Sequence, residues 1–210
     1  METLTCSLPW YFSLILGRAS TVVVSGTKIV RPSGQINPTN KDPSFSECKR
    51  LDFEAEIGAV VGKNSDIGKP VKVSEAGEYV FGYVLLNDWS ARDIQGWEYI
   101  PLGPFTAKNF ATTISPWIVT TEALTPFRVS LPEQIPRPLP YLFQENLSSY
   151  DLNIQVNLRP QNEGKIYKLA ETNYKYMYWS VDQQVAHHTV TGCNLQVGDL
   201  LGSGKILILY

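Results

Sequence analysis

The sequence predicts a mixed, strand-rich α+β fold with one long helix, and four stretches support that prediction. The run Val80 to Leu86 is almost wholly apolar, which is typical of a strand covered on both faces. Leu51 to Gly58 and Asp151 to Leu158 alternate in polarity with a period of two, as half-buried strands do. Apolar residues recur at three and four residue spacings from Tyr174 to Val185, which predicts the helix.

Turn-forming residues divide the rest of the chain into short elements. Thr172 or Asn173 is the expected N-cap of the long helix, which should end before Gly192. The other expected elements are a hairpin of 21–24 and 28–30 turning at 25–26, a polar loop over 32–43, a turn-rich connection over 62–70, a short helical piece at 75–79, helical or turn structure at 90–99, a strand over 113–120 interrupted at Pro116, a proline-dense surface excursion over 126–140, a strand at 167–170 pairing with the one before it, turns over 192–204, and a final strand at 206–209.

Composition excludes several classes of protein. The chain has 210 residues, of which 43% are hydrophobic and 18% charged, so it is long enough for a sizeable core. A net charge of −2 gives no basic surface for nucleic acid. Cys6, Cys48 and Cys193 are odd in number and widely spaced, which suggests no disulfide framework and favours a reducing, cytoplasmic setting. The apolar start, Met1 to Leu16, is too short to span a membrane and makes a poor signal peptide.

Three carboxylates share one face of the stretch Leu51 to Gly58. Alternation puts Asp52, Glu54 and Glu56 on one side, with neighbouring side chains roughly 6.5–7 Å apart. Buried anions are costly, so one is protonated, Lys or Arg neutralises them, or a cation binds. Asp88, at the end of the central strand, would complete an oxygen-only site for Mg²⁺ or Ca²⁺.

The segment after Asp88 is rich in side chains that could do chemistry. Arg92, Gln95, Tyr99 and Lys108 follow it on an irregular stretch, and such stretches on a rigid strand often hold functional sites. An alternative interpretation makes Asp88 a helix N-cap and Arg92 its ion-pair partner, with the nearby tryptophans in the core.

His187 and His188 are the only histidines, near the end of the predicted long helix. One of them could act as a general base, since histidine titrates near neutral pH. The alternative is an interaction with the last carbonyls of the helix.

A set of long motifs in consistent order gives the chain a family resemblance. They are GRASTVVVSG, LDFEAEIG, LLNDWSARDIQGWEYIPLGPF, AKNFATTISPW, RPLPYL, YKYMYW and QQVAHHTVTGCNLQVGDLLGSG. From about Gly17 to Gly204 these motifs resemble the fumarylacetoacetase (fumarylacetoacetate hydrolase) family. The resemblance implies a sandwich or roll core of the C-terminal-domain type over residues 17–210, with 1–16 a non-homologous start. It also implies hydrolysis of fumarylacetoacetate to fumarate and acetoacetate, the last step of tyrosine and phenylalanine breakdown, by a homodimer.

The resemblance also implies roles for particular residues. Glu54, Glu56 and Asp88 match metal ligands, and Lys108 and Thr112 match a second site associated with Mg²⁺. Gln95 and Tyr99 match substrate-binding positions. Arg92, Gln95 and Lys108 match groups that stabilise the departing carbanion.

Some of the family's residues have no match here. The family's general-base His, a fourth metal-binding Asp and a substrate-contacting Tyr precede the GRAS motif, and Met1 to Leu16 matches none of them. The Glu that orients this His would lie beyond Tyr210, and Lys205 replaces a substrate-binding Thr. We therefore expect weak or lost activity, and self-association through the apolar 206–209. The alternatives are a related hydrolase or decarboxylase of 2-oxo acids, or a non-catalytic metal-binding module.

Overall fold

Two strands carry the chain between two units of the computed structural model, which describes residues 19–37 and 42–206. Strand β5 (Ala55–Val61) leaves unit 2 after Glu56, and β6 (Val80–Asp88) returns to it after Tyr83. Unit 1 holds the described residues 57–83 and 118–206, and unit 2 holds 19–37, 42–56 and 84–117. The fold is mixed α+β and rich in strands, as predicted, with two α-helices among the described residues.

Unit 2 contains a small sheet and two short hairpin-like pairs. In the sheet β1 runs parallel to β8, and β8 runs antiparallel to the end of β6. β2 pairs with β3, and β4 pairs with β7. The elements of unit 2 are η1 (Ala19–Thr21), β1 (Val22–Val24), β2 (Ser33–Ile36), β3 (Ser44–Glu47), β4 (Leu51–Asp52), β7 (Ser90–Ala91), α1 (Arg92–Leu102) and β8 (Thr112–Ile114).

A compact apolar cluster fixes α1 in unit 2. Ile94 of α1 is 1% exposed and packs with Ile36, Cys48, Ala91 and Ala107. A Cβ on Gly34 would come within 2.8 Å of the end of the Ile94 side chain, so a larger residue there would force the buried Ile94 to shift. The cluster thus holds the start of α1 against the loop that ends at Lys108.

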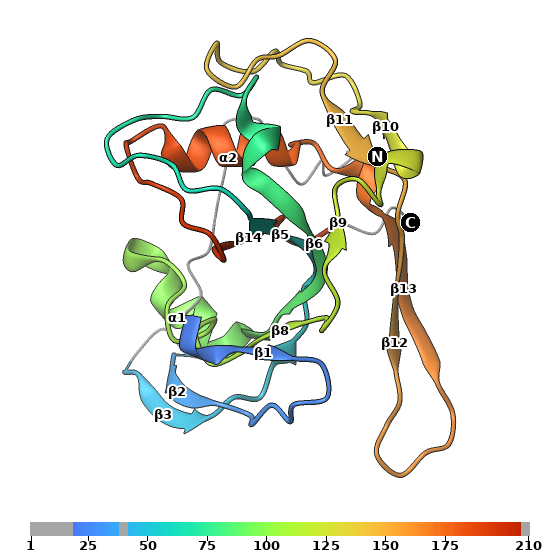
Figure 1. Ribbon diagram of the computed structural model, residues 1–210. Coiled ribbons are helices and arrows are strands. Elements are labelled where there is room, and N and C mark those ends of the chain that lie inside the picture. Colours follow the sequence, from blue (N-terminus) through green and yellow to red (C-terminus); the bar gives the residue numbers. More distant parts are fainter. Residues whose placement is uncertain (1–18, 38–41, 207–210) are drawn as a thin grey trace. The chain divides into compact units, whose positions relative to one another are not determined.

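Unit 1 is built from β-pairs and the second helix. β6 pairs with β9 on one side and neighbours β5 on the other, and β14 pairs antiparallel with β5. β10 pairs with β11, and β12 with β13 forms the long orange hairpin of Figure 1. The elements of unit 1 are η2 (Ala76–Tyr79), β9 (Val119–Thr120), η3 (Thr125–Phe127), β10 (Arg128–Ser130), β11 (Ser148–Tyr150), β12 (Asn153–Leu158), β13 (Tyr167–Asn173), η4 (Tyr174–Tyr176), α2 (Val181–Thr189) and β14 (Leu200–Gly202).

The predicted long helix is wrong, because the chain forms two shorter pieces there. Asn173 does act as a cap, but of the single turn η4, accepting a hydrogen bond from Lys175 N at 3.0 Å. Met177 is then extended, with φ −62° and ψ 140°. Ser180 starts α2 with a capping box, in which its hydroxyl and the Gln183 side chain each bond the other's backbone.

Several other predictions need correction. The turn at 25–26 is present, but residues 28–30 form no strand. The partner of β1 is β8 instead, and Ser25 N extends that pairing by donating to Ile114 O. The polar stretch 32–43 contains β2, whose Ile36 enters the core. Turns were predicted over 192–204, where β14 forms. Of the predicted strand 206–209, residues 207–209 lie outside the described residues, and Ile206 is buried without being in a strand.

The central strand, the strand broken at Pro116, the short helical turn at 76–79 and the pair β12–β13 are confirmed. Among the described residues, no helix is both long enough and apolar enough to cross a bilayer.

Candidate active site

Backbone contacts around Glu54 and Asp88 bring the acidic residues of unit 2 together. Asp88 is the last residue of β6, as predicted, and its N–H donates to Glu54 O at 3.1 Å. The predicted single strand over 51–58 is instead broken at Phe53 and Glu54, between β4 and β5. The Asp52 carboxylate accepts from Phe53 N at 2.9 Å, a local bond that competes with strand pairing. This break lets Glu54 approach Asp88.

The three predicted carboxylates converge at one place. Glu54, Glu56 and Asp88 each offer an oxygen, and these atoms lie within 4.8 Å of one another. Glu54 is 8% exposed and Glu56 5% exposed. This is closer than residues two apart on a flat strand would allow, so the break in the strand and the arrival of β6 both contribute.

Two cationic side chains reach into this carboxylate cluster. Lys108 is fully buried, with its Nζ 2.8 Å from Asp88 Oδ2 and in contact with Glu54 Oε2. Arg92 lies with Nη2 2.8 Å from both Glu54 Oε1 and Asp52 Oδ2. Of the three ways to offset buried anions, neutralisation by Lys and Arg is therefore present.

Burial and ion pairing have opposite effects on the pKa values of Asp88 and Arg92 in the carboxylate cluster. Burial raises the pKa of Asp88, while the hydrogen bond and charge of Lys108 lower it only in part. Burial would lower the pKa of Arg92, but hydrogen bonds to Glu54 and Asp52 outweigh it and raise that pKa overall. Arg92 is thus held in its charged form, whereas Asp88 takes up a proton more readily than a solvated aspartate does.

The oxygen donors of the carboxylate cluster suit a divalent cation. Asp52, Glu54 and Asp88 each contact Arg92 or Lys108, and Glu56 adds an oxygen within 4.8 Å of those of Glu54 and Asp88. Hard cations such as Mg²⁺ and Ca²⁺ prefer carboxylate oxygens. The carboxylate donors therefore fit such an ion.

The remaining predicted site residues flank the carboxylate cluster in different ways. Arg92 Nη1 donates to Gln95 Oε1 at 3.0 Å. Tyr99 lies seven residues after Arg92, on the same face of α1, with 57% of its surface exposed. Thr112 is buried and stands opposite Asp88 in the pairing of β6 with β8. Arg92, Gln95 and Thr112 are thus connected to the carboxylate cluster, whereas Tyr99 lies on an exposed part of α1.

The structure contradicts the alternative interpretation of Asp88 as a helix cap. The N-cap of α1 is Ala91, and Arg92 pairs with Asp52 and Glu54. The nearby tryptophans are not simply core residues either. Trp97 is 39% exposed and donates to Gln35, and Trp89 donates to Thr113.

Both histidines lie in the last turn of α2, as predicted, and thus in unit 1. The Tyr141 hydroxyl lies 2.8 Å from His187 Nδ1. Burial lowers the pKa of His187, and burial and the charge of His187 lower that of His188. Burial thus favours the neutral form of both imidazoles, which weakens an interaction with the helix dipole and leaves a ring N–H that can still donate to a carbonyl.

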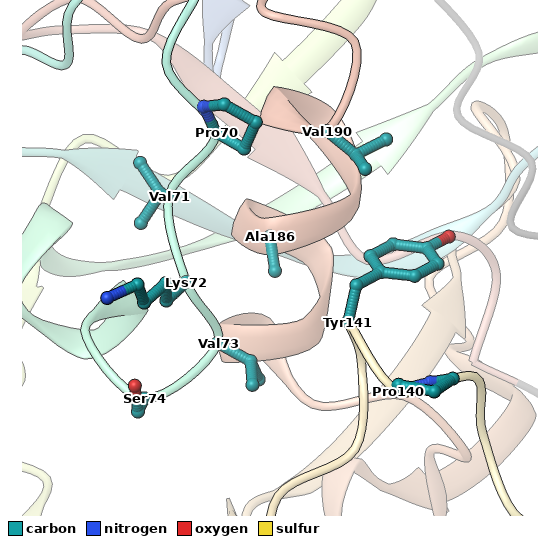
Figure 2. Close-up of a pocket in the computed structure, with 9 residues that line it drawn as sticks. All are labelled: Pro70, Val71, Lys72, Val73, Ser74, Pro140, Tyr141, Ala186 and Val190. Carbon is teal, nitrogen blue, oxygen red and sulfur yellow. The ribbon is translucent and has the colours of Figure 1, made fainter.

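A hollow of about 310 Å³ lies in unit 1 beside α2. Figure 2 shows segment 70–74 along one side, Ala186 at its floor and Tyr141 opposite. Its lining is mainly apolar and includes no Asp or Glu. Lys72 is the one charged residue in this lining, so the hollow has no set of opposed charges like that of the carboxylate cluster.

Sequence reasoning missed two residues that shape the site. Asp52 was placed on the carboxylate face but given no role, and it holds Arg92 through Nε at 2.9 Å. The Asn87 side chain accepts from Glu54 N at 3.1 Å and so fixes the broken strand. Asn87 borders Asp88, yet nothing local in the sequence signals a contact with Glu54.

Comparisons with known proteins agree on one family. A family model described as fumarylacetoacetate (FAA) hydrolase C-terminal matches residues 5–206. Fumarylacetoacetases of Arabidopsis thaliana and Homo sapiens are each 53% identical over 191 residues, 90% of this chain. That of Bos taurus is 54% identical over the same length. The chain spans 45% of the Arabidopsis relative and 46% of the other two, less than half of each.

Solved structures resemble the fold at low sequence identity. A fumarylacetoacetate hydrolase family protein of yeast has a TM-score of 0.56 and 20% identity, covering 91% of this chain and 71% of that one. A fumarylpyruvate hydrolase from Pseudomonas aeruginosa, in complex with Mn²⁺ and pyruvate, has a TM-score of 0.51 and 16% identity, covering 88% and 83%. At these identities the likeness concerns the fold alone.

Proposed function

This chain belongs to the fumarylacetoacetate hydrolase family, and from that premise we propose that it takes part in hydrolysing fumarylacetoacetate to fumarate and acetoacetate. Residues 17–210 would then be part of a catalytic domain with a sandwich or roll core, acting in tyrosine and phenylalanine breakdown. The observation that carries the proposal is the meeting of Glu54, Glu56 and Asp88 with Arg92 and Lys108 in unit 2.

The reaction creates negative charge that these residues can offset. Water adds its oxygen to a carbonyl carbon, the adjacent carbon–carbon bond breaks, and its electron pair leaves with one fragment as an enolate. The proton from the water ends on that departing carbon. Arg92 and Lys108 are held in place by carboxylates, so their charges need little reorganisation as the enolate forms.

The exposed face of α1 would orient the substrate. Gln95 holds Arg92 through its amide oxygen, and its amide nitrogen is a donor that a substrate oxygen can use. Tyr99, one turn further along the same face, adds an aromatic surface with a hydroxyl. We assign substrate binding to Gln95 and Tyr99 on this basis.

The carboxylate cluster is the proposed cation site. Glu54, Glu56 and Asp88 would hold Ca²⁺ or Mg²⁺, with Lys108 and Thr112 at a second position associated with Mg²⁺. A divalent cation bound there would polarise carbonyl oxygens as a Lewis acid. A homodimer is part of the same proposal, and light scattering would test it.

A rate measurement tests the reaction. Loss of the ultraviolet absorbance of fumarylacetoacetate gives kcat for the unaltered protein and for Arg92→Lys, which cannot reproduce the three-sided contacts of a guanidinium. We expect kcat to fall by about 10²-fold, as for loss of one stabilising donor. Arg137→Lys, at an exposed arginine stacked on Phe143 in unit 1, is the matched control and should keep the rate.

Fumarylpyruvate serves as the competing substrate in the same assay. A protein that turns over fumarylpyruvate and leaves fumarylacetoacetate intact would replace the proposed substrate with a 2-oxo acid. Because the unaltered protein is expected to turn over slowly, the decisive comparison is between variants, and a rate that Arg92→Lys leaves unchanged would contradict the proposed function.

A further inference from the structure

Lys108 is placed by a tight turn of backbone. Gly103, with φ +96°, and Pro104 redirect the chain after α1. Phe105 O then accepts from Lys108 N at 3.1 Å and from Asn109 N at 2.9 Å, closing a single turn over 105–109. Like the start of any helical turn, this one has first N–H groups that no partner within the turn can satisfy.

The Glu98 carboxylate supplies the partners for those N–H groups. Its Oε1 accepts from Phe105 N at 2.7 Å and from Ala107 N at 2.8 Å. Its Oε2 accepts from Thr106 N at 3.1 Å and from the Thr106 hydroxyl at 2.7 Å. One side chain thus binds three consecutive backbone N–H groups, which fixes the orientation of the peptide units directly before Lys108.

The same contacts tie the turn to the helix that carries Arg92. Glu98 is on α1, in the regular part before Ile100, where φ and ψ leave the helical region. On the other side of the turn, Ala107 O accepts from Ala91 N at 2.9 Å, next to the first residue of α1. The turn before Lys108 is therefore held at both of its sides by the segment that positions Arg92 and Gln95.

We propose that Glu98 is a positioning residue that, by clamping the turn 105–107 to α1, places the Lys108 ammonium between Glu54 and Asp88. This inference rests on the proposed function for its catalytic consequence. Its structural part stands on the contacts alone. If the supporting turn shifted by about 1 Å, the Lys108 ammonium would stabilise the negative charge that develops in the transition state much less.

A double-mutant cycle tests whether Glu98 acts through Lys108. Glu98→Gln puts an amide N–H₂ against backbone donors, so we expect kcat to fall roughly 10- to 100-fold with KM little changed. In a Lys108→Ala background the same change should have no further effect. Glu78→Gln, at an exposed glutamate paired with Lys63 in unit 1, is the matched control and should leave kcat unchanged.

Chemical acylation of lysines, followed by mass spectrometry, measures the placement without activity. Lys108 has no exposed side-chain surface and should be acylated slowly, whereas Lys72 provides an exposed reference. Glu98→Gln should raise the acylation rate of Lys108 about tenfold and leave Lys72 unchanged. If Glu98→Gln fails to fold, Thr106→Val removes only one of the four bonds and should give a smaller rise.

The outcomes separate the two proposals. The positioning role would be overturned by two results together. The losses in kcat from Glu98→Gln and Lys108→Ala would multiply in the double variant, and the acylation rate of Lys108 would be unchanged in Glu98→Gln. The proposed function would still stand. A Lys108→Ala protein with full kcat would contradict the proposed function, while faster acylation of Lys108 in Glu98→Gln would still support the placement.

Discussion

A buried polar network in unit 2 and one in unit 1 differ in charge. In unit 2, Lys108 and Arg92 meet Glu54 and Asp88 out of contact with most solvent. In unit 1, Gln183 is fully buried and uncharged. Its amide nitrogen donates to Gln134 Oε1 at 2.8 Å and to Leu142 O at 3.0 Å, and its oxygen accepts from Ser180 N at 3.0 Å.

The difference fits a structural network in unit 1 and the proposed functional network in unit 2. A buried neutral network with all its hydrogen bonds made costs little and specifies how the elements pack. Burying ions costs several kcal/mol each, which mutual attraction repays only in part. Four carboxylates come to one place from β4 (Asp52), the break after it (Glu54), β5 (Glu56) and the end of β6 (Asp88). A buried network of this cost is expected where chemistry, more than stability, requires the charges.

The largest expected effect comes from removing the buried cation. Lys108→Met leaves Glu54 and Asp88 buried without their ammonium, so we expect the free energy of unfolding to fall by about 3–5 kcal/mol. Urea denaturation with and without Mg²⁺ or Ca²⁺ measures this change. Because the variant has one more uncompensated negative charge, a divalent cation should restore more stability to it than it adds to the unaltered protein.

Removing the carboxylates gives the reciprocal control. Glu54→Gln/Glu56→Gln should abolish the heat of divalent cation binding in calorimetry. Equal heats for this variant and the unaltered protein would show that the charged network is not a cation site. The contrast between the two units would then concern stability alone.

The sequence predicted the elements that local patterns define. The apolar run Val80 to Leu86 and the alternation in 153–158 each became a strand. The prediction of a long helix was wrong because the apolar spacing from Tyr174 continues through Met177, whose extended backbone interrupts the helix. The S-x-x-Q capping box at Ser180 was nevertheless visible in the sequence and could have placed the start of α2.

The site residues were predictable as residue types, but their contacts were not. The pairing of Glu54 with Asp88 joins positions 34 apart, and its geometry depends on a strand break set by Asp52. Glu98 illustrates the same limit. Its sequence neighbourhood shows an acid on a helix, while its partners, Phe105 to Ala107, follow only from the fold of the turn.

An intermediate effect is expected from the neutral network. Gln183→Leu keeps the volume but leaves Ser180 N and Leu142 O buried without their partner. We expect unfolding free energy to fall by about 2–3 kcal/mol. Divalent cations should restore none of this loss, and calorimetry should show cation binding as in the unaltered protein. Recovery of the variant by Mg²⁺ or Ca²⁺ would erase the distinction between the two networks.

The smallest expected effect concerns a carboxylate that unit 1 partly buries, Asp182 in the first turn of α2. Burial raises the pKa of Asp182, and the charge of Arg128 lowers it only in part. The folded state therefore binds this proton more tightly than the unfolded chain, so stability from this group is present at low pH and is lost as pH rises through the folded-state pKa. Asp182→Asn removes that loss, and we expect Tm at pH 7 to rise by about 1–3 °C, with no rise below the ordinary pKa of 3.8.

Asp151→Asn is the opposite case, because hydrogen bonds to Lys175 and Asn173 lower the pKa of Asp151. Its stabilising effect is present above the ordinary pKa and lost as pH falls, so this variant should lose Tm at pH 7 and match the unaltered protein in acid. Thermal melts of both variants across pH measure the two slopes. Slopes of the same sign would mean that burial does not dominate at Asp182, and that unit 1 tolerates a buried charge as unit 2 does.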